Sequence, residues 1–226
     1  MNTLALEARP RPAVLVSCVL VFLASTWVTI AWCGSLCDMP GMGVWSRMPG
    51  QTWLEHFLVF EGMWIVMMIA MMMPVFAPVL LREIATPLPV AMGYFMAWSL
   101  LGVALYPLGV AAAALAPGPM VGGVLVIIAG VLQFGERKAR LLKCCMMVSG
   151  TAFRDGFRTG IHCIRCCAGL TATLLVVGVM DLWAMALATL AIAAERLLPS
   201  STRAAPAIGV GLIGIGVVLC ARALGW

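Results

Sequence analysis

The chain has 226 residues, of which 63% are hydrophobic and 10% charged, and its mean hydropathy is +1.08. Soluble domains carry about a quarter charged residues, so this composition excludes an ordinary water-soluble protein. The net charge is +5. Because the positive residues cluster beside the ends of apolar segments, they favour a membrane topology over a nucleic-acid partner.

Four apolar segments in the first part of the chain are long enough to cross a bilayer, which takes about twenty helical residues. They are residues 13–32, 56–80, 88–114 and 120–134. The first has no small-x-small cleavage site after it, so we expect it to be retained rather than removed as a signal peptide.

The apolar segment 160–194 is longer than one crossing needs and a little short for two. It is either one tilted helix or a pair broken near Gly178 and Asp181. A last segment, 206–224, contains glycines suited to close helix packing, namely Gly209, Gly211, Gly214 and Gly216. The sequence therefore predicts an all-α, polytopic transmembrane helical bundle with six or seven spans, forming a single membrane domain over residues 1–226.

Lysine and arginine set the expected orientation. They crowd the loop 136–160 and precede the first segment, which places both on the cytoplasmic side. The loop 34–55 is then the outer loop. We expect a multi-pass protein of the bacterial inner (cytoplasmic) membrane with its N-terminus in the cytoplasm.

The strongest local motif contains His162, Cys163, Cys166 and Cys167. On a helix that turns by about 100° per residue, the four side chains fall within roughly 140° of arc. Thiolate and imidazole groups are the donors that select copper(I) or zinc. A single cysteine is more often a packing residue, but several on one arc favour a metal or redox role. Two further thiols, Cys144 and Cys145 in the basic loop, are candidates to complete the site.

Methionines form two lines along segment 56–80. One line contains Met63, Met67 and Met71, and the other contains Glu61, Met68 and Met72. Thioethers bind copper(I), so Met63, Met67 and Met71 are candidate ligands. Methionine is also an adaptable packing residue, and taken alone the run is more typical of a core.

Other residues in or beside the apolar segments leave alternatives open. Glu61 and Asp181 are costly within a membrane, and Asp181 either pairs with a cation or caps a helix that begins there. In the outer loop, Cys33 and Cys37 are either metal donors or a disulfide. Pro74 and Pro78 should kink or end their helix, which can open a cavity within the bundle.

Several motifs, taken in order, resemble a bacterial membrane family of unknown function described as predicted metal-binding integral membrane proteins. They are Met48-Pro49-Gly50-Gln51-Thr52-Trp53, Met63-Trp64 with Met67-Met68, Ala70-Met71-Met72 and Pro74, Tyr94 with Trp98, Gln133 with Lys138, Cys163 with Cys166-Cys167, Gly178-Val179-Met180, Leu182-Trp183 with Met185, and Glu195. The chain departs from the family pattern where Glu136 and Leu141 replace an expected proline and cysteine and where His162 replaces tyrosine. The resemblance implies a membrane protein that binds metal.

We therefore expect a non-enzymatic membrane protein that binds a soft transition metal, copper(I) before zinc, for transport, delivery or sensing. Its expected partners are the lipid bilayer, the metal ion and further subunits of a membrane complex, with no nucleic acid. One alternative is a membrane thiol oxidoreductase that uses Cys166 and Cys167, or Cys144 and Cys145. The other is a structural or assembly subunit of a larger membrane complex.

Overall fold

The computed structural model describes residues 12–37, 45, 50–81, 87–115, 119–135, 152–178, 181–197 and 201–225. Every regular element in these ranges is a helix, which confirms the predicted all-α class. The helices are α1 (Pro12–Cys37), α2 (Trp53–Leu81), α3 (Pro87–Ala114), α4 (Pro119–Leu132), α6 (Phe153–Val177), α7 (Leu182–Leu197) and α8 (Ser201–Ala223). Five of them, α1, α2, α3, α6 and α8, are long and apolar enough to cross a membrane.

The helix α4 is shorter than the sequence predicted for segment 120–134. It has 14 residues. At about 1.5 Å per residue it is roughly 21 Å long, less than the about 30 Å of a bilayer core. α4 is therefore not among the five helices of crossing length, and the expected fourth crossing stays a prediction. The helix ends before Gln133, whose side chain bonds to a buried partner described below.

The segment 160–194 is a pair of helices, as the second of the two alternatives predicted. α6 ends at Gly178, whose φ of 136° is a conformation that L side chains rarely adopt. Asp181 Oδ1 then accepts the backbone N–H groups of Trp183 at 2.8 Å and Ala184 at 3.0 Å. Asp181 is thus the cap of α7, which confirms its proposed capping role.

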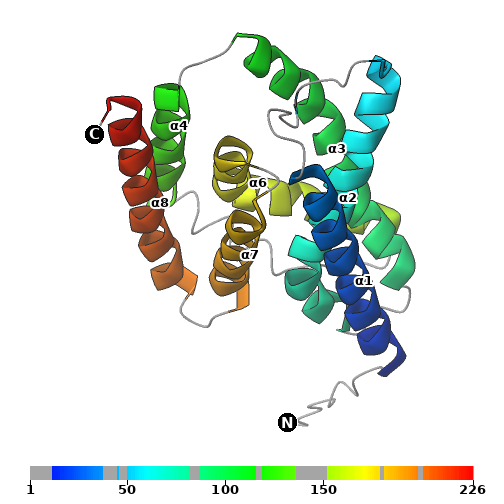
Figure 1. Cartoon of the computed structure of the whole chain (residues 1–226). Coiled ribbons are helices and arrows are strands. Elements are labelled where there is room, and N and C mark those ends of the chain that lie inside the picture. The colour runs from blue at the N-terminus through cyan, green and yellow to red at the C-terminus, as the bar shows by residue number, and fades with distance from the viewer. Residues whose placement is uncertain are drawn as a thin grey trace.

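α2 and α6 each pack against three other helices of the bundle (Figure 1). α2 packs against α1, α3 and α7, while α6 packs against α3, α4 and α7, and α4 lies side by side with α8. The largest fully buried side chains include Trp64, Met68 and Met72 of α2 and Tyr94 and Trp98 of α3. The core is therefore densest where α2, α3 and α6 meet.

α2 is a long helix with a well-defined start. Thr52 and Glu55 form a capping box, in which Thr52 N–H donates to Glu55 Oε2 at 2.9 Å and Glu55 N–H donates to Thr52 Oγ1 at 3.2 Å. The helix continues through Pro74 and Pro78 to Leu81. Neither proline ends it, which leaves the methionines on one continuous element.

Glycines allow α3 and α6 to approach closely. A Cβ atom added at Gly156 would fall on the backbone of Val90, and one added at Gly160 would lie 2.7 Å from Ala97 Cβ and 2.8 Å from Tyr94 O. Gly156 and Gly160 are four residues apart, the spacing of a small-xxx-small packing motif. This contact fixes Tyr94 opposite the thiols of α6.

A second glycine contact joins α4 to α8. Added Cβ atoms at Gly123 and Gly130 would lie 2.9 Å from the carbonyl oxygens of Gly216 and Gly209, respectively. Two of the four α8 glycines that the sequence singled out therefore pack as predicted. The other two, Gly211 and Gly214, have no atom within 4 Å of an added Cβ.

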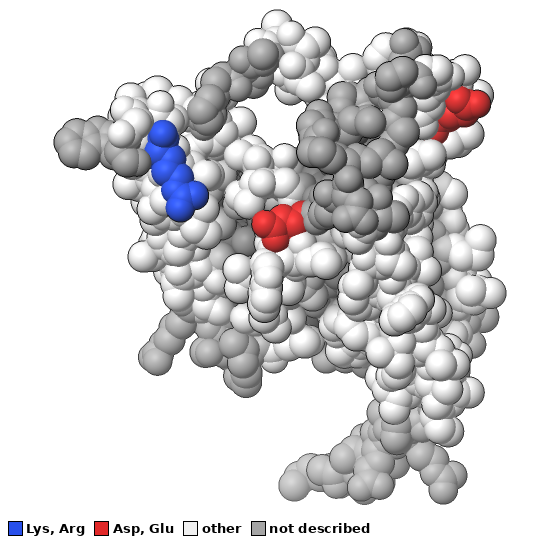
Figure 2. Space-filling model, in the orientation of Figure 1, with Lys and Arg blue, Asp and Glu red and all other residues white. Residues whose placement is uncertain are grey.

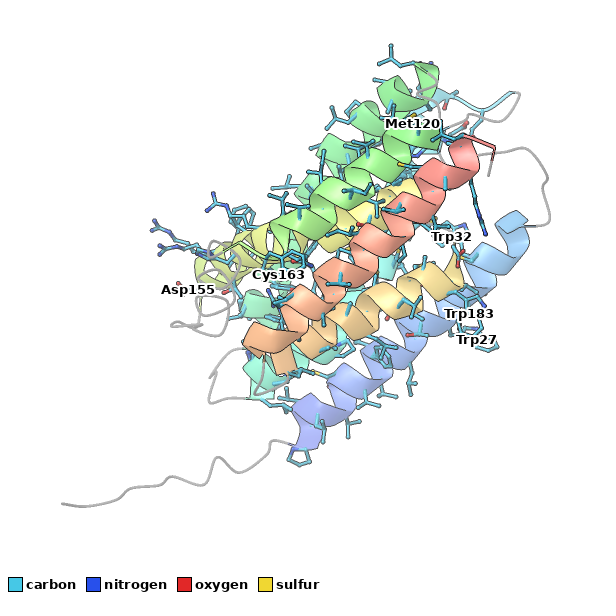
Figure 3. The ribbon with its side chains drawn as sticks, turned by 90° about the vertical axis from the view of Figure 1, so that its left-hand side faces the viewer. Trp27, Trp32, Met120, Asp155, Cys163 and Trp183 are labelled. Carbon is cyan, nitrogen blue, oxygen red and sulfur yellow. The ribbon has the colours of Figure 1, made fainter. Side chains whose placement is uncertain are left out.

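The surface formed by the described residues is largely apolar. Figure 2 shows that Lys, Arg, Asp and Glu are sparse on the face in view. Large side chains such as Leu20 of α1 and Leu187 of α7 are exposed. Figure 3 places Trp27, Trp32 and Trp183 at one end of the bundle, away from Asp155 at the start of α6.

Candidate metal centre

Cys163 of α6 is the centre of a buried group of sulfur atoms. Its Sγ lies 3.9 Å from Met72 Sδ of α2 and 4.0 Å from Cys167 Sγ, one turn further along α6. Tyr94 of α3 donates its hydroxyl hydrogen to Cys163 Sγ at 2.9 Å. We call Met72, Cys163 and Cys167 the sulfur cluster. None of the three is more than 1% exposed.

Aromatic packing positions the cluster. Phe76, one turn after Met72, stacks on Tyr94 with ring centroids 4.0 Å apart and planes 10° apart. One turn before Met68, Trp64 donates its indole N–H to Trp98 O at 3.0 Å. These contacts fix the rotation of α2 against α3, so Met72 points to the α3–α6 contact.

The spacing of the sulfur atoms suits shared metal ligation. With metal–sulfur bonds of about 2.3 Å, two ligands at the roughly 120° of a trigonal site stand about 4.0 Å apart. The Cys163–Met72 and Cys163–Cys167 distances of 3.9 and 4.0 Å match that value. Two thiols and a thioether are soft donors, and the thioether in particular suits copper(I).

Arg196 of α7 lies within electrostatic reach of the cluster. Arg196 interacts electrostatically with both Cys163 and Tyr94. The preceding residue, Glu195, is 1% exposed and accepts a hydrogen bond from Gln133 Nε2 at 3.0 Å. A cation near the cluster partly offsets the negative charge that thiolate ligands bring into an apolar bundle.

The structure brings together part of the predicted donor set. Cys163, Cys166 and Cys167 are buried on α6, and His162 is half-buried beside them. Within the described ranges, no three His, Cys, Asp or Glu side chains form a group ready to bind a metal. The full set of four donors stays a prediction, and zinc has no support in the structure. Cys144 and Cys145 lie outside the described residues.

Both methionine lines of α2 are buried, but they differ in what they contact. The line of Met63, Met67 and Met71, whose members were predicted as ligands, lies in the core. Met72, from the other line, is the methionine that contacts Cys163. Sequence reasoning identified both lines and missed which one reaches the thiols, because Cys163 lies 91 residues further along the chain. It also gave Tyr94 no role beyond the resemblance.

The outer-loop alternatives are untested. Cys33 is buried in the core at the end of α1, while the side chain of Cys37 lies outside the described residues. The choice between donors and a disulfide therefore stays a prediction. Met39, Met42 and Met48 lie outside the described part of the chain as well.

A sequence model of the family described as "PpoB2: Copper chaperone" matches residues 61–219, well over half of the chain. The matched range includes Met72, Tyr94, Cys163 and Cys167. This match supports the metal-related part of the resemblance, and the description of the family names copper. Comparisons with curated proteins and with solved structures found no match.

Proposed function

We propose that this chain, which belongs to the PpoB2 copper chaperone family, binds copper(I) at the sulfur cluster and delivers it to an acceptor from within the bacterial inner membrane. The observation that supports this most is the contact of Cys163 Sγ with Met72 Sδ and Cys167 Sγ at 3.9 and 4.0 Å. Copper is the protein's cargo in this proposal. The protein binds it and performs no chemical conversion.

Burial of the cluster suits a carrier of copper(I). Water and oxygen reach an exposed copper(I)–thiolate site easily, whereas all three sulfur atoms here lie inside the bundle. The thioether is the selective ligand, since zinc is bound by thiolate, imidazole and carboxylate groups. The cluster therefore favours copper(I) over zinc.

Several features support a membrane location. Five helices have crossing length and composition, and the exposed side chains along them are mostly apolar. Trp27 and Trp183, which are 73% and 81% exposed, lie at the same end of the bundle (Figure 3), as in the aromatic belt of a membrane interface. The basic loop assigns the opposite end, with Asp155, to the cytoplasm.

Cell fractionation tests the location. We expect the protein in the inner-membrane fraction after an alkaline wash, which removes peripheral proteins. Recovery in the soluble fraction, or release by the wash, would contradict a membrane-spanning protein.

Delivery is favoured over active pumping because the chain has no nucleotide-binding motif. A site of only three soft ligands releases its metal by ligand exchange with an acceptor that offers similar donors. No change in the copper oxidation state is needed for such a transfer.

Anaerobic loading with copper(I) in mild detergent tests the function. The wild type is expected to retain copper after desalting, and Cys163→Ser to lose most of it because the central ligand is gone. Met72→Leu and Cys167→Ser should bind more weakly. Cys220→Ser is the matched control, since Cys220 lies on α8 away from the cluster.

Two results would contradict copper binding at this cluster: a wild-type protein that binds no copper, or a Cys163→Ser protein that retains all of it. If copper is absent and Cys166 and Cys167 cycle between thiol and disulfide in cells, the thiol oxidoreductase alternative is favoured instead.

A further inference from the structure

One line of side chains along α2 connects the sulfur cluster with the far half of the bundle. Glu61, Trp64, Met68 and Met72 follow each other at intervals of three or four residues, so each lies about one turn from the next within roughly 80° of arc. This line faces α3, as the contacts of Glu61 with Ser99 and of Trp64 with Trp98 show.

The line runs away from the cytoplasmic end. Gly62, next to Glu61, lies beside Trp32, since a Cβ added at Gly62 would be 3.6 Å from the Trp32 ring. Figure 3 shows Trp32 at the end opposite Asp155, with Cys163 nearer to Asp155. Glu61 thus lies toward the end of the bundle that contains the tryptophans, and Met72 lies at the sulfur cluster.

Glu61 has one carboxylate oxygen available to a cation. Its Oε1 accepts the Ser99 hydroxyl hydrogen at 2.6 Å, while the buried Oε2 has no hydrogen-bond partner among the described residues. Gly102 makes room for this oxygen, because a Cβ there would lie 2.5 Å from Oε2 and 2.8 Å from Trp64 Nε1. A carboxylate in an apolar segment is costly, which indicates a function.

The three side chains beyond Glu61 all carry groups of a kind that binds soft cations in proteins. The indole of Trp64 offers a cation–π surface, and the thioethers of Met68 and Met72 are copper(I) donors. Met68 is 1% exposed and lies about 6 Å along the helix from Met72. Glu61, Trp64 and Met68 each offer a single weak contact, which passage of an ion requires, whereas Met72 at the end of the line shares the sulfur cluster with two thiols that help to retain the ion.

We propose that Glu61, Trp64, Met68 and Met72 form the route along which copper(I) moves between the outer half of the bundle and the sulfur cluster. This inference rests on the proposed function. Along the route copper stays copper(I) and only its ligands change: the carboxylate attracts the ion, and the thioethers exchange with the thiols of Cys163 and Cys167.

Copper release from loaded protein tests the route. Protein in detergent, loaded with copper(I) and desalted, is mixed with bathocuproine disulfonate, a water-soluble copper(I) chelator, and formation of the coloured complex is followed. Met68→Leu keeps volume and apolarity but removes the sulfur donor. We expect it to slow release by about tenfold without changing the amount bound. Glu61→Gln should slow release similarly.

Met67→Leu is the matched control. Met67 is adjacent to Met68 and equally buried, at 1% exposed, but it lies on the other methionine line. Its release rate should equal that of the wild type. Circular dichroism confirms that all variants remain helical.

The results of these measurements distinguish a failure of the proposed route from a failure of the proposed function. If Met68→Leu and Glu61→Gln load normally and release copper as fast as Met67→Leu, the route is wrong while copper binding at the cluster stands. If the wild type loads no copper, the proposed function and the route both fail.

Discussion

The α3–α6 and α4–α8 helix pairs both pack closely through glycines, but their surroundings differ. In each, glycines bring two backbones together: Gly156 meets Val90 in the first, and Gly130 meets Gly209 in the second. Beside the first contact stand Tyr94 and Cys163, which are hydrogen-bonded. Beside the second stand aliphatic side chains such as Ile127 and Ile213, whose Cγ1 atoms lie within 3 Å of a Cβ added at the facing glycines.

The difference shows that close backbone approach does not by itself create a site. It creates one at α3–α6 because polar and sulfur side chains project next to the glycines. Among the described residues at α4–α8, the glycines lie beside a single thiol, Cys220, whose Sγ would be 2.5 Å from a Cβ added at Gly123, and mostly aliphatic side chains. Substitutions that change stability and copper binding by different amounts can therefore test whether the two contacts differ in function.

The largest effect is expected for Gly156→Ala. The new methyl group meets the Val90 backbone, so α3 and α6 must move apart, at a cost of about 1–3 kcal/mol in the free energy of unfolding. Gly130→Ala should cost a similar amount at α4–α8. Only Gly156→Ala should also lower the amount of copper bound per folded chain. Copper content and the free energy of unfolding are both measured on the same protein in detergent.

Equal copper loss in Gly130→Ala would mean that the two contacts do not differ in function. Gly211→Ala is the neutral control, because an added Cβ there meets nothing within 4 Å.

Gln133→Leu tests the connection between the two regions. Gln133 follows α4 and donates to buried Glu195 of α7, next to Arg196, which acts on Cys163. Removing the donor weakens the solvation of a buried carboxylate, with an expected loss of about 1–3 kcal/mol. Glu195→Gln keeps an acceptor oxygen and should cost less. A thermal-unfolding midpoint for Gln133→Leu equal to that of the wild type would contradict this bond's role.

Asp181→Ala tests the break between α6 and α7. It removes the cap that accepts the Trp183 and Ala184 N–H groups, and should cost about 1 kcal/mol. Asp181→Asn retains the capping oxygen and should be close to the wild type. Copper binding should be unchanged in both, because Asp181 lies at the end of α6 far from Cys163; a loss of copper in Asp181→Ala would connect it to the cluster.

Tyr94→Phe is expected to change stability least. The ring keeps its stacking on Phe76, and only the hydrogen bond to Cys163 Sγ is lost, at about 0.5–1.5 kcal/mol. The copper(I) affinity should fall by about tenfold, since the hydroxyl supports a metal ligand. Competition with a chelator of known affinity measures it. An unchanged affinity would show that Tyr94 serves packing alone.

Much of the helical framework could be predicted from the sequence. The expected segment 56–80 matches α2 at Trp53–Leu81, and 88–114 matches α3 at Pro87–Ala114. Apolar run length is a local property, so it predicts helix bounds well. For α4 the predicted end at residue 134 lies two residues beyond the observed end at Leu132, and Gln133 in that stretch bonds to Glu195, a partner 62 residues away.

The site could be predicted only in its local part. Cys163 and Cys167 are one helical turn apart, so their proximity follows from the sequence. The partners Met72 and Tyr94 lie 91 and 69 residues away. Both lines of α2 contain buried methionines, and helical spacing alone does not show which of them faces Cys163.

The sequence by itself determined the helical class, the apolar surface and the pair of thiols on α6, because each depends on neighbours along the chain. Only the tertiary structure decided that Met72 rather than Met71 faces Cys163. It also decided that the sulfur cluster lies beside the glycine contact of α3 with α6 and not beside that of α4 with α8. The physical reason is that rotation of one helix against another is set by side-chain packing between distant segments. For α2 that packing is the stacking of Phe76 on Tyr94 and the bond from Trp64 to Trp98.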